Sequence, residues 1–308
     1  MARRRRGEAI SGWINLDKPL GLGSTPAVSR VRRAFDAQKA GHAGTLDPLA
    51  TGVLPIALGE ATKTIPLLAD ATKTYRFTIA WGVATSTLDT EGEGIERSDV
   101  RPSRSDAERA LTGFLGETAQ VPPAFSAIKV AGERAYDLAR EGRPPVLSAR
   151  PVHLHRAEVA SEAGPDHLEV EIDCGKGFYI RSLARDLALA LGAVAHVAAL
   201  RRLRVGPFHA ADAIGVASLD ALCDKGTALE ALLPVETALD DIPALAVTDE
   251  DAFRLTQGRS VVLLPRQVET LTPRLSASRS VSALNGGRLV ALCEMRAGRL
   301  SPVRVFHL

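Results

Sequence analysis

The sequence predicts an α+β fold, in which a sheet-based domain precedes a small β-rich unit. Residues 75–83 alternate apolar with polar or small side chains at a period of two, which is typical of a half-buried strand, and residues 168–172 repeat the pattern. Residues 180–191 place apolar side chains along one helical stripe. Residues 281–295 read as a hairpin around an Asn-Gly-Gly turn. Strands and helices therefore share the first domain, and strands dominate the last unit.

A short strand and a helix are the first elements expected. Residues 12–19 (GWINLDKP) read as a strand that runs into a Lys-Pro turn. A helix is expected over residues 26–37, because apolar residues recur there at helical spacing, and Ser24 or Thr25 can cap it. Residues 53–58 then read as a short buried element.

Several further elements follow the first strand pattern. Residues 105–108 form a capping box that predicts a helix start. Residues 121–142 read as a Pro-rich turn, a strand and a helix, and an extended basic loop then leads into a strand near 152–160. Residues 196–208 are a strand-like run with three arginines, and residues 212–242 form an acidic connector.

The composition is that of a soluble globular protein in a reducing compartment. Of 308 residues, 45% are hydrophobic and 24% charged, and no apolar run reaches the roughly 18 residues of a membrane span. Three cysteines lie far apart, which argues against a disulfide framework. No Cys or His pair has zinc-ligand spacing. We therefore expect a cytoplasmic protein without a structural metal or a membrane anchor.

The charge distribution favours a polyanionic partner. Residues 212–251 carry a net charge of −9, so the remainder of the +2 chain carries +11. The basic N-terminus, with four arginines at 3–6, is not followed by an apolar segment and so is not a secretory signal. It reads as a flexible basic arm over residues 1–9, which either meets a polyanion or is a solvated tail. A basic body of this kind suits nucleic acid.

The most constrained stretch is residues 41–55, GHAGTLDPLATGVLP, which surrounds the single carboxylate Asp47. Three glycines and two prolines make a regular helix or strand through Asp47 unlikely on local grounds, so a held loop is expected. Loops on a rigid scaffold often carry chemistry. Asp before Pro also starts ordinary turns, so this stretch alone leaves a structural and a catalytic interpretation open.

Familiar catalytic motifs are absent, which leaves three residues as a candidate site. The chain has no Walker spacing, no GxGxxG after a strand, no GxSxG elbow and no second carboxylate in a similar loop. Arg181 falls in the first turn of a predicted helix, where a cation opposes the helix dipole, so an anion should lie near it. An arginine keeps a carboxylate ionised and aimed, and such an Asp47 can act as a nucleophile without metal or cofactor.

Tyr75 completes this set, since a tyrosine at the start of a strand can stack on a planar ring. Structural alternatives exist for each partner. Arg181 can make a surface ion pair, and Tyr75 can pack in the core on its apolar strand face.

Taken together, these stretches resemble the bacterial tRNA pseudouridine synthases of the TruB type. The resemblance covers roughly residues 10–210, with the motifs in the family's order, and the tail from Pro243 is similar to the small PUA-type RNA-binding domain of these enzymes. The matching motifs are INLDKPLG, GHAGTLDPLATGVLP, GEATK, KTYRF, PPAFSAIKVAGERAYDLAREG, GKGFYIRSLARDL and LRRLRVGPF.

The resemblance implies a pseudouridine synthase fold, with a mixed, mostly antiparallel sheet over residues 10–240 and a PUA-like unit over 241–308. It implies that the chain isomerises the T-loop uridine of tRNA at the position conventionally numbered fifty-five, after flipping the base out of its stack. The roles that it implies are Asp47 as nucleophile, Arg181 as its ion-pair partner, Tyr75 stacking on the base, Tyr179 and Leu200 lining the uridine pocket, and His42 filling the gap left by the base.

The expected partner is the T-arm stem-loop of tRNA, bound by a monomer with no cofactor. The family commonly reads C-S-K-G-T-Y-I-R where this chain has Gly175 and Phe178, so two hydroxyls are missing beside the site. Two alternatives remain, an RNA chaperone that refolds tRNA and a guide-RNA-dependent synthase of the dyskerin type. RNA contacts are expected from seven basic residues: Lys18, Lys63, Lys129, Arg140, Arg143, Arg201 and Arg202.

Overall fold

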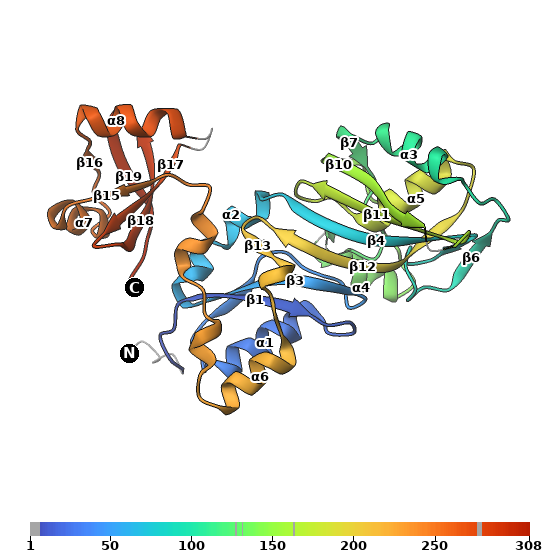
Figure 1. Cartoon of the computed structure of the whole chain (residues 1–308), viewed down its shortest axis with the longest axis horizontal. Coiled ribbons are helices and arrows are strands. Elements are labelled where there is room, and N and C mark those ends of the chain that lie inside the picture. Colours follow the sequence, from blue (N-terminus) through green and yellow to red (C-terminus); the bar gives the residue numbers. More distant parts are fainter. Residues whose placement is uncertain (1–6, 127, 131, 163, 276–278) are drawn as a thin grey trace.

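The computed structural model describes residues 7–126, 128–130, 132–162, 164–275 and 279–308, in two units (Figure 1). The stretch 212–242, expected as an acidic connector, instead adds a strand (Ile214–Gly215) and a helix (Val216–Asp224) to the larger unit. The arginines at 3–6 lie outside the described residues. Gly7 and Glu8, which belong to the predicted arm, form hydrogen bonds with residues that follow the first helix. Glu8 N donates to Asp36 O at 2.6 Å, and the Gln38 side chain donates to Gly7 O at 2.9 Å.

A mixed sheet of ten strands dominates the larger unit, in the order β14-β1-β3-β12-β4-β11-β10-β7, with β13 beside β12 and β2 beside β3. Only β1/β14 and β12/β3 pair in parallel, so the predicted mostly antiparallel sheet is confirmed. The strands are β1 (Gly12–Lys18), β2 (Ala40–His42), β3 (Ala50–Leu58), β4 (Lys73–Trp81), β7 (Gly116–Gln120), β10 (Arg150–Glu162), β11 (His167–Cys174), β12 (Ala195–Val205), β13 (Phe208–His209) and β14 (Ile214–Gly215).

Four helices of this unit, α1, α3, α5 and α6, pack on the sheet face that carries the apolar side chains of β4, whereas Leu68 of α2 belongs to a second core with Trp13 and Phe208. Tyr75, Phe77, Ile79 and Trp81 are all buried in one core with residues from α1, α3, α5 and α6. Two short hairpins, β5/β6 and β8/β9, extend from the sheet. The bounds are α1 (Ser24–Ala34), α2 (Ile65–Asp70), α3 (Arg104–Thr112), α4 (Ala135–Arg140), α5 (Ile180–Ala190), α6 (Val216–Asp224), β5 (Val83–Thr85), β6 (Gly94–Arg97), β8 (Lys129–Val130) and β9 (Glu133–Arg134).

Two predicted helix caps are wrong, and both helices begin earlier than expected. The N-cap of α1 is Gly23, without a side-chain cap, because the buried Ser24 hydroxyl bonds a different segment of the chain. The helix also ends at Ala34, before the expected residue 37. The cap of α3 is Ser103, whose side chain accepts a hydrogen bond from Asp106 N. Local patterns place these helices correctly but misplace their ends by a few residues.

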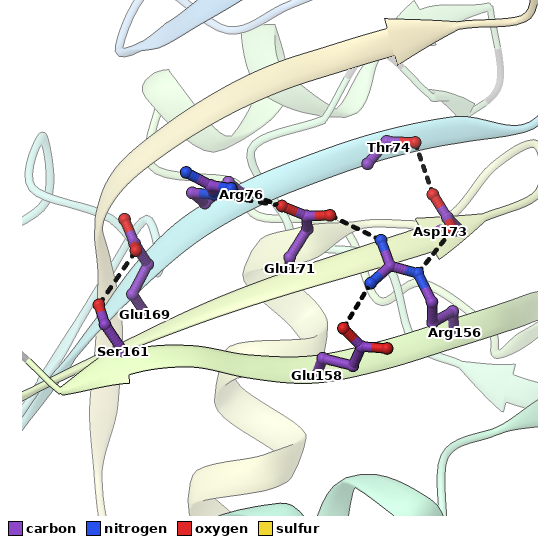
Figure 2. Close-up of polar contacts among 8 residues, drawn as sticks. All are labelled: Thr74, Arg76, Arg156, Glu158, Ser161, Glu169, Glu171 and Asp173. Atoms are coloured by element: carbon purple, nitrogen blue, oxygen red, sulfur yellow. Dashed lines mark hydrogen bonds and ion pairs between the residues drawn. The ribbon is translucent and has the colours of Figure 1, made fainter.

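The other face of the sheet carries a network of charged side chains across β4, β11 and β10 (Figure 2). Arg156 donates to Asp173 at 2.8 Å, to Glu171 at 2.6 Å and to Glu158 at 2.8 Å. Arg76 donates to Glu171 from the opposite side, also at 2.8 Å. Apart from the Arg156–Glu158 pair within β10, these contacts run between neighbouring strands, so the network links β4, β11 and β10 on this face.

We expect Arg156→Met to lower the free energy of unfolding by about 1–2 kcal/mol near neutral pH. Burial raises the pKa of Glu171, but hydrogen bonds from Arg156 and Arg76 outweigh it, so the pKa lies below its usual value. Burial likewise raises the pKa of Asp173, but hydrogen bonds from Arg156 and Thr74 and the nearby arginine charges together lower it below its usual value. A lowered carboxyl pKa stabilises the fold above the unfolded value, about 4, and that contribution is lost as the pH falls.

Urea unfolding of the wild type and Arg156→Met between pH 3 and pH 7 checks this prediction. The difference between the two proteins should shrink below about pH 4. The matched control is Arg97→Met, which removes an exposed arginine of β6 and should show no such pH dependence. A difference that stays constant with pH would mean that the ion pairs do not contribute.

The smaller unit has a five-stranded sheet in the order β15-β17-β18-β19-β16 and its own apolar core. The predicted hairpin around Asn285 is confirmed as β17/β18. The unit is fastened to the larger one, since Lys63 donates to Val305 O at 2.7 Å and His307 N donates to Glu60 at 2.9 Å. Its elements are β15 (Ala244–Ala246), α7 (Asp249–Thr256), β16 (Val261–Val262), α8 (Pro265–Leu271), β17 (Ser280–Asn285), β18 (Arg288–Arg296) and β19 (Arg299–Val305).

In the part of the chain that the structure describes, every helix is too short or too polar to cross a membrane.

Candidate active site

Asp47 lies in the loop between β2 and β3, two strands that pair with each other in antiparallel fashion. Gly44 in this loop, with φ +95°, and Gly52 in β3, with φ +99°, adopt backbone conformations that other residues rarely reach. A Cβ atom on Gly52 would lie 2.2 Å from the backbone oxygen of Arg202. The sequence therefore needs glycine here for a close approach of β3 to β12.

Three buried side chains from other elements hold the loop by its backbone. The Ser24 hydroxyl donates to Leu46 O and accepts from Leu46 N, both at 2.8 Å. The Lys18 ammonium donates to Pro48 O at 3.3 Å. These two contacts fix the residues immediately before and after Asp47.

Arg202, the third of these side chains, is 1% exposed and holds the loop from the side of β12. Its guanidinium donates to Val53 O at 2.7 Å, to Gly44 O at 3.0 Å and to Thr45 O at 3.4 Å. The predicted RNA contacts of Arg202 and of the fully buried Lys18 are thus replaced by contacts to this loop. We assign both residues to loop positioning.

We expect Arg202→Met to lower both the melting temperature and the rate of the reaction, because two loop carbonyls and one carbonyl of β3 lose a buried donor. A loss of about 2–4 kcal/mol in the free energy of unfolding is the expected scale. Arg201→Met is the matched control on the same strand, since Arg201 is partly exposed and pairs with Asp17 at 2.8 Å. It should weaken RNA binding and leave the melting temperature within experimental scatter. Equal melting temperatures for the two variants would contradict the loop-holding role of Arg202.

Arg181 joins the loop to two carboxylates. It lies in the first turn of α5, and its Nη2 is 2.7 Å from Asp47 Oδ2, while its Nη1 is 3.2 Å from Asp89 Oδ2. Carbonyl oxygens of Phe125, at 2.8 Å, and Thr87, at 3.0 Å, accept further hydrogen bonds from the guanidinium. The sequence predicts an anion beside the start of α5, and two carboxylates, those of Asp47 and Asp89, lie there.

The two carboxylates differ in exposure, which separates their possible uses. The side chain of Asp89 is 2% exposed and that of Asp47 is 39% exposed, whereas Arg181 is 6% exposed. Asp89 is also held by Glu91 N at 3.0 Å and by the Thr87 hydroxyl. A buried, fully held carboxylate can orient Arg181, and only the accessible Asp47 can reach a substrate.

Asp89 was missed by the sequence reasoning. It lies in the turn of the β5/β6 hairpin, where no sequence motif indicates a functional residue. Its neighbour Leu88 has φ +63°, and the Asp89 backbone bridges to Val197 of β12. The bridge to Val197 and the ion pair with Arg181 both join Asp89 to residues distant in sequence. No local pattern could therefore have indicated the role of Asp89.

A cavity of about 400 Å³ opens beside Asp47. Tyr75, Tyr179, Arg181 and Leu200 line it together with Asp47, so five of the six predicted site residues meet there. His42 lies on β2, next to the lining residue Ala43, and does not line the cavity itself. The remaining lining residues are Ala43, Gly44, Thr45, Leu46, Ile65, Ala69, Lys73, Ser126, Gly175, Lys176, Gly177, Phe178, Ile180 and Arg202.

Burial sets the protonation of the groups around the cavity. It raises the pKa of Tyr75 and that of Tyr179, so both phenols stay protonated at neutral pH. Burial and then the Arg202 cation lower the pKa of His42, which is therefore neutral. Burial also lowers the pKa of Lys18 to about 8, although the Asp47 carboxylate opposes this change. The cavity thus presents one carboxylate among uncharged rings and buried cations.

Of the other residues predicted to contact RNA, three are exposed and one lies between the two units. Lys129, Arg140 and Arg143 are exposed, and Arg140 stacks on Tyr136 with 4.6 Å between guanidinium and ring centroid. Lys63 instead bonds Glu60 and the smaller unit, and its ammonium lies 5.7 Å from the Phe306 ring centroid. Lys63 therefore fastens the two units together. Within the described ranges, no three Asp, Glu, His or Cys side chains group as a metal site.

The chain matches two family models and has close relatives of full length. Residues 32–180 match the TruB family pseudouridylate synthase N-terminal domain, and residues 181–240 match the tRNA pseudouridylate synthase B C-terminal domain. It is 66% identical over 309 residues to the tRNA pseudouridine synthase B of Caulobacter sp. (strain K31) and 64% identical over 309 residues to that of Caulobacter vibrioides, covering 100% of each chain in both comparisons.

Solved structures share the same architecture. A chain in the crystal structure of a Cbf5-Nop10-Gar1 complex superposes with a TM-score of 0.71 at 27% identity, over 96% of this chain and 84% of that one. A chain in the structure of an H/ACA RNP bound to a substrate RNA containing 2′-deoxyuridine gives a TM-score of 0.73 at 22% identity, over 100% and 92% of the two chains. The second likeness shows the fold alone.

Proposed function

The chain belongs to the TruB family of tRNA pseudouridine synthases, and on that premise we propose that Asp47 is the nucleophile with which it converts the T-loop uridine of tRNA into pseudouridine. The observation that carries the proposal is the Arg181–Asp47 ion pair at the wall of the cavity. The guanidinium binds one carboxylate oxygen by a charge-assisted hydrogen bond and fixes the direction of the side chain. It binds Oδ2, which leaves Oδ1 of Asp47 for attack.

The mechanism has three steps. Asp47 Oδ1 attacks either C1′ of the ribose, which releases the base, or C6 of the uracil; the two routes remain alternatives. The base then turns within the cavity, so that C5 replaces N1 opposite C1′ and a C–C bond forms. On the C6 route the N1–C1′ bond breaks before the base turns. The bond to Asp47 is lost as C5 attacks C1′ on the first route, and by elimination from C6 on the second. C5 loses its proton and N1 gains one, so the product is an isomer of the substrate.

The residues around the cavity supply what this reaction needs. Tyr75 would stack on the extruded base, Tyr179 and Leu200 would bound its pocket, and His42 would fill the gap left in the RNA. Base flipping before chemistry requires such an enclosed site with an aromatic surface. We propose that the T-arm stem-loop binds to a cytoplasmic monomer that needs no cofactor or metal, with a catalytic domain over residues 10–240 and a PUA-like domain over 241–308.

Binding of the T-arm should depend steeply on salt, because exposed cations meet phosphates. Each phosphate contact should contribute a slope of about −0.7 to −0.9 in log K against log salt concentration. Filter binding between low and moderate salt checks this slope, and removing Arg140 should reduce it by about 1. A slope near zero would contradict RNA contacts from Lys129, Arg140 and Arg143.

Release of tritium from C5 of the target uridine tests the proposed function. We expect the purified chain alone to release it from a T-arm stem-loop that carries the label. Binding with no release would favour the RNA chaperone alternative. Release that requires accessory proteins and a guide RNA would favour the dyskerin-type alternative.

A further inference from the structure

The hydroxyl of Ser126 is buried, and the reaction described above assigns it no role. Ser126 is 3% exposed and lines the cavity that holds Asp47. Among the described residues its Oγ has no hydrogen-bond partner. Buried hydroxyls are nearly always paired, because leaving one unpaired costs its lost hydration. The unpaired Ser126 hydroxyl therefore either destabilises the free protein without a function or forms its hydrogen bond with a bound ligand.

The segment that carries Ser126 is held firmly against the start of α5. The Gln120 side chain accepts from Tyr179 N at 2.8 Å and donates to Tyr179 O at 3.1 Å. The next residue, Val121, accepts the Ser182 hydroxyl at 2.8 Å, and Phe125 O accepts from Arg181. Hydrogen bonds thus join residues 120–125 to Tyr179, Arg181 and Ser182 at the start of α5.

Ser126 itself is anchored by its backbone, since Tyr136 N donates to its carbonyl at 3.0 Å. Burial raises the pKa of Tyr179, and the nearby Ser126 hydroxyl opposes that rise, yet no hydrogen bond of normal geometry joins the two side chains. The backbone that carries the hydroxyl is therefore anchored, while the hydroxyl itself has no hydrogen-bond partner among the described residues.

We propose that the Ser126 hydroxyl binds the imide edge of the target uracil inside the cavity, an inference that rests on the proposed function. A serine hydroxyl both donates and accepts, so it can bond the O2 or O4 carbonyl or the N3–H group of that edge. A half-turn of the base about its N3–C6 axis exchanges N1 with C5 and O2 with O4. The imide edge therefore presents the same pattern before and after the turn, and one fixed hydroxyl can hold it in both states.

The first test compares Ser126→Ala with Ser182→Ala, two buried serines on adjoining segments. Ser126→Ala removes an unpaired hydroxyl, so its melting temperature should equal or exceed that of the wild type, while tritium release from the T-arm slows about tenfold. Ser182→Ala removes a paired hydroxyl and should lower the melting temperature. A Ser126→Ala variant that is as fast as the wild type, or that is less stable by as much as Ser182→Ala, would overturn the inference.

The second test combines the Ser126→Ala variant with substrates in which one carbonyl oxygen of the target base is replaced. T-arm stem-loops with 4-thiouridine or 2-thiouridine at the target position replace one carbonyl oxygen by sulfur, a weaker acceptor. At least one of them should slow the wild type about fivefold more than it slows Ser126→Ala. If the rate effects of Ser126→Ala and of the thio substitution are independent of each other for both substrates, the proposed contact is wrong. A wild type that releases no tritium from the unmodified T-arm would instead overturn the proposed function itself.

Discussion

Asp47→Asn should abolish pseudouridine formation and leave the affinity for a T-arm stem-loop within a few-fold of the wild type. Asparagine keeps the shape of the side chain but is not a nucleophile of comparable strength, and it removes the charge that Arg181 binds at 2.7 Å. The rate of tritium release should fall by about 10⁴-fold or more. Because the loop is held by its backbone through Ser24, Lys18 and Arg202, the fold around the site should persist.

Asp166→Asn is the matched control for this variant. Asp166 is exposed and pairs with Arg101, away from the residues that line the cavity. It should react at the wild-type rate. Retained turnover in Asp47→Asn, measured under single-turnover conditions with enzyme in excess, would sink the assignment of the nucleophile.

Asp89→Asn should slow the reaction by about 10²-fold although Asp89 does not line the main cavity. Its buried carboxylate fixes Nη1 of Arg181, and without that charge the guanidinium loses the partner that sets its direction toward Asp47. Weakening a buried charge pair should also cost roughly 2–4 kcal/mol of stability. RNA affinity should change little, since the side chain is inaccessible to RNA.

Glu96→Gln controls for the removal of a carboxylate from the same hairpin, because Glu96 is exposed on β6. Single-turnover rates and thermal unfolding of both variants check the prediction. If Asp89→Asn were unstable but fully active per folded molecule, Asp89 would be a structural residue only.

Local patterns were sufficient to predict the sheet and the core of the site. The alternation around Tyr75 identified β4 and its buried face, although the strand begins two residues earlier, at Lys73. The position of Arg181 in the first turn of a helix required an anion, and the glycines around Asp47 indicated a fixed loop. These inferences succeeded because each depends on residues close together in sequence.

The remaining features depend on contacts between distant residues. Arg202 and Arg201 are neighbours in sequence, yet β12 turns one into the protein and leaves the other partly exposed. The bond between Ser24 and Leu46, and that between Lys63 and the smaller unit, join segments that no local pattern connects. The mixed, mostly antiparallel character of the sheet likewise followed from the family resemblance, and the order of its strands was not predicted.

The distance from Asp47 Oδ1 to the target nucleotide tests the central claim most directly. It can be measured in a crystal structure of the wild-type chain with a T-arm stem-loop that carries an altered uridine at the target position. We predict that Oδ1 lies at or within about 3.5 Å of C1′ or C6, with Arg181 still bound to Oδ2. A target base outside the cavity, or an Asp47 carboxylate more than about 5 Å from both carbons, would contradict the account.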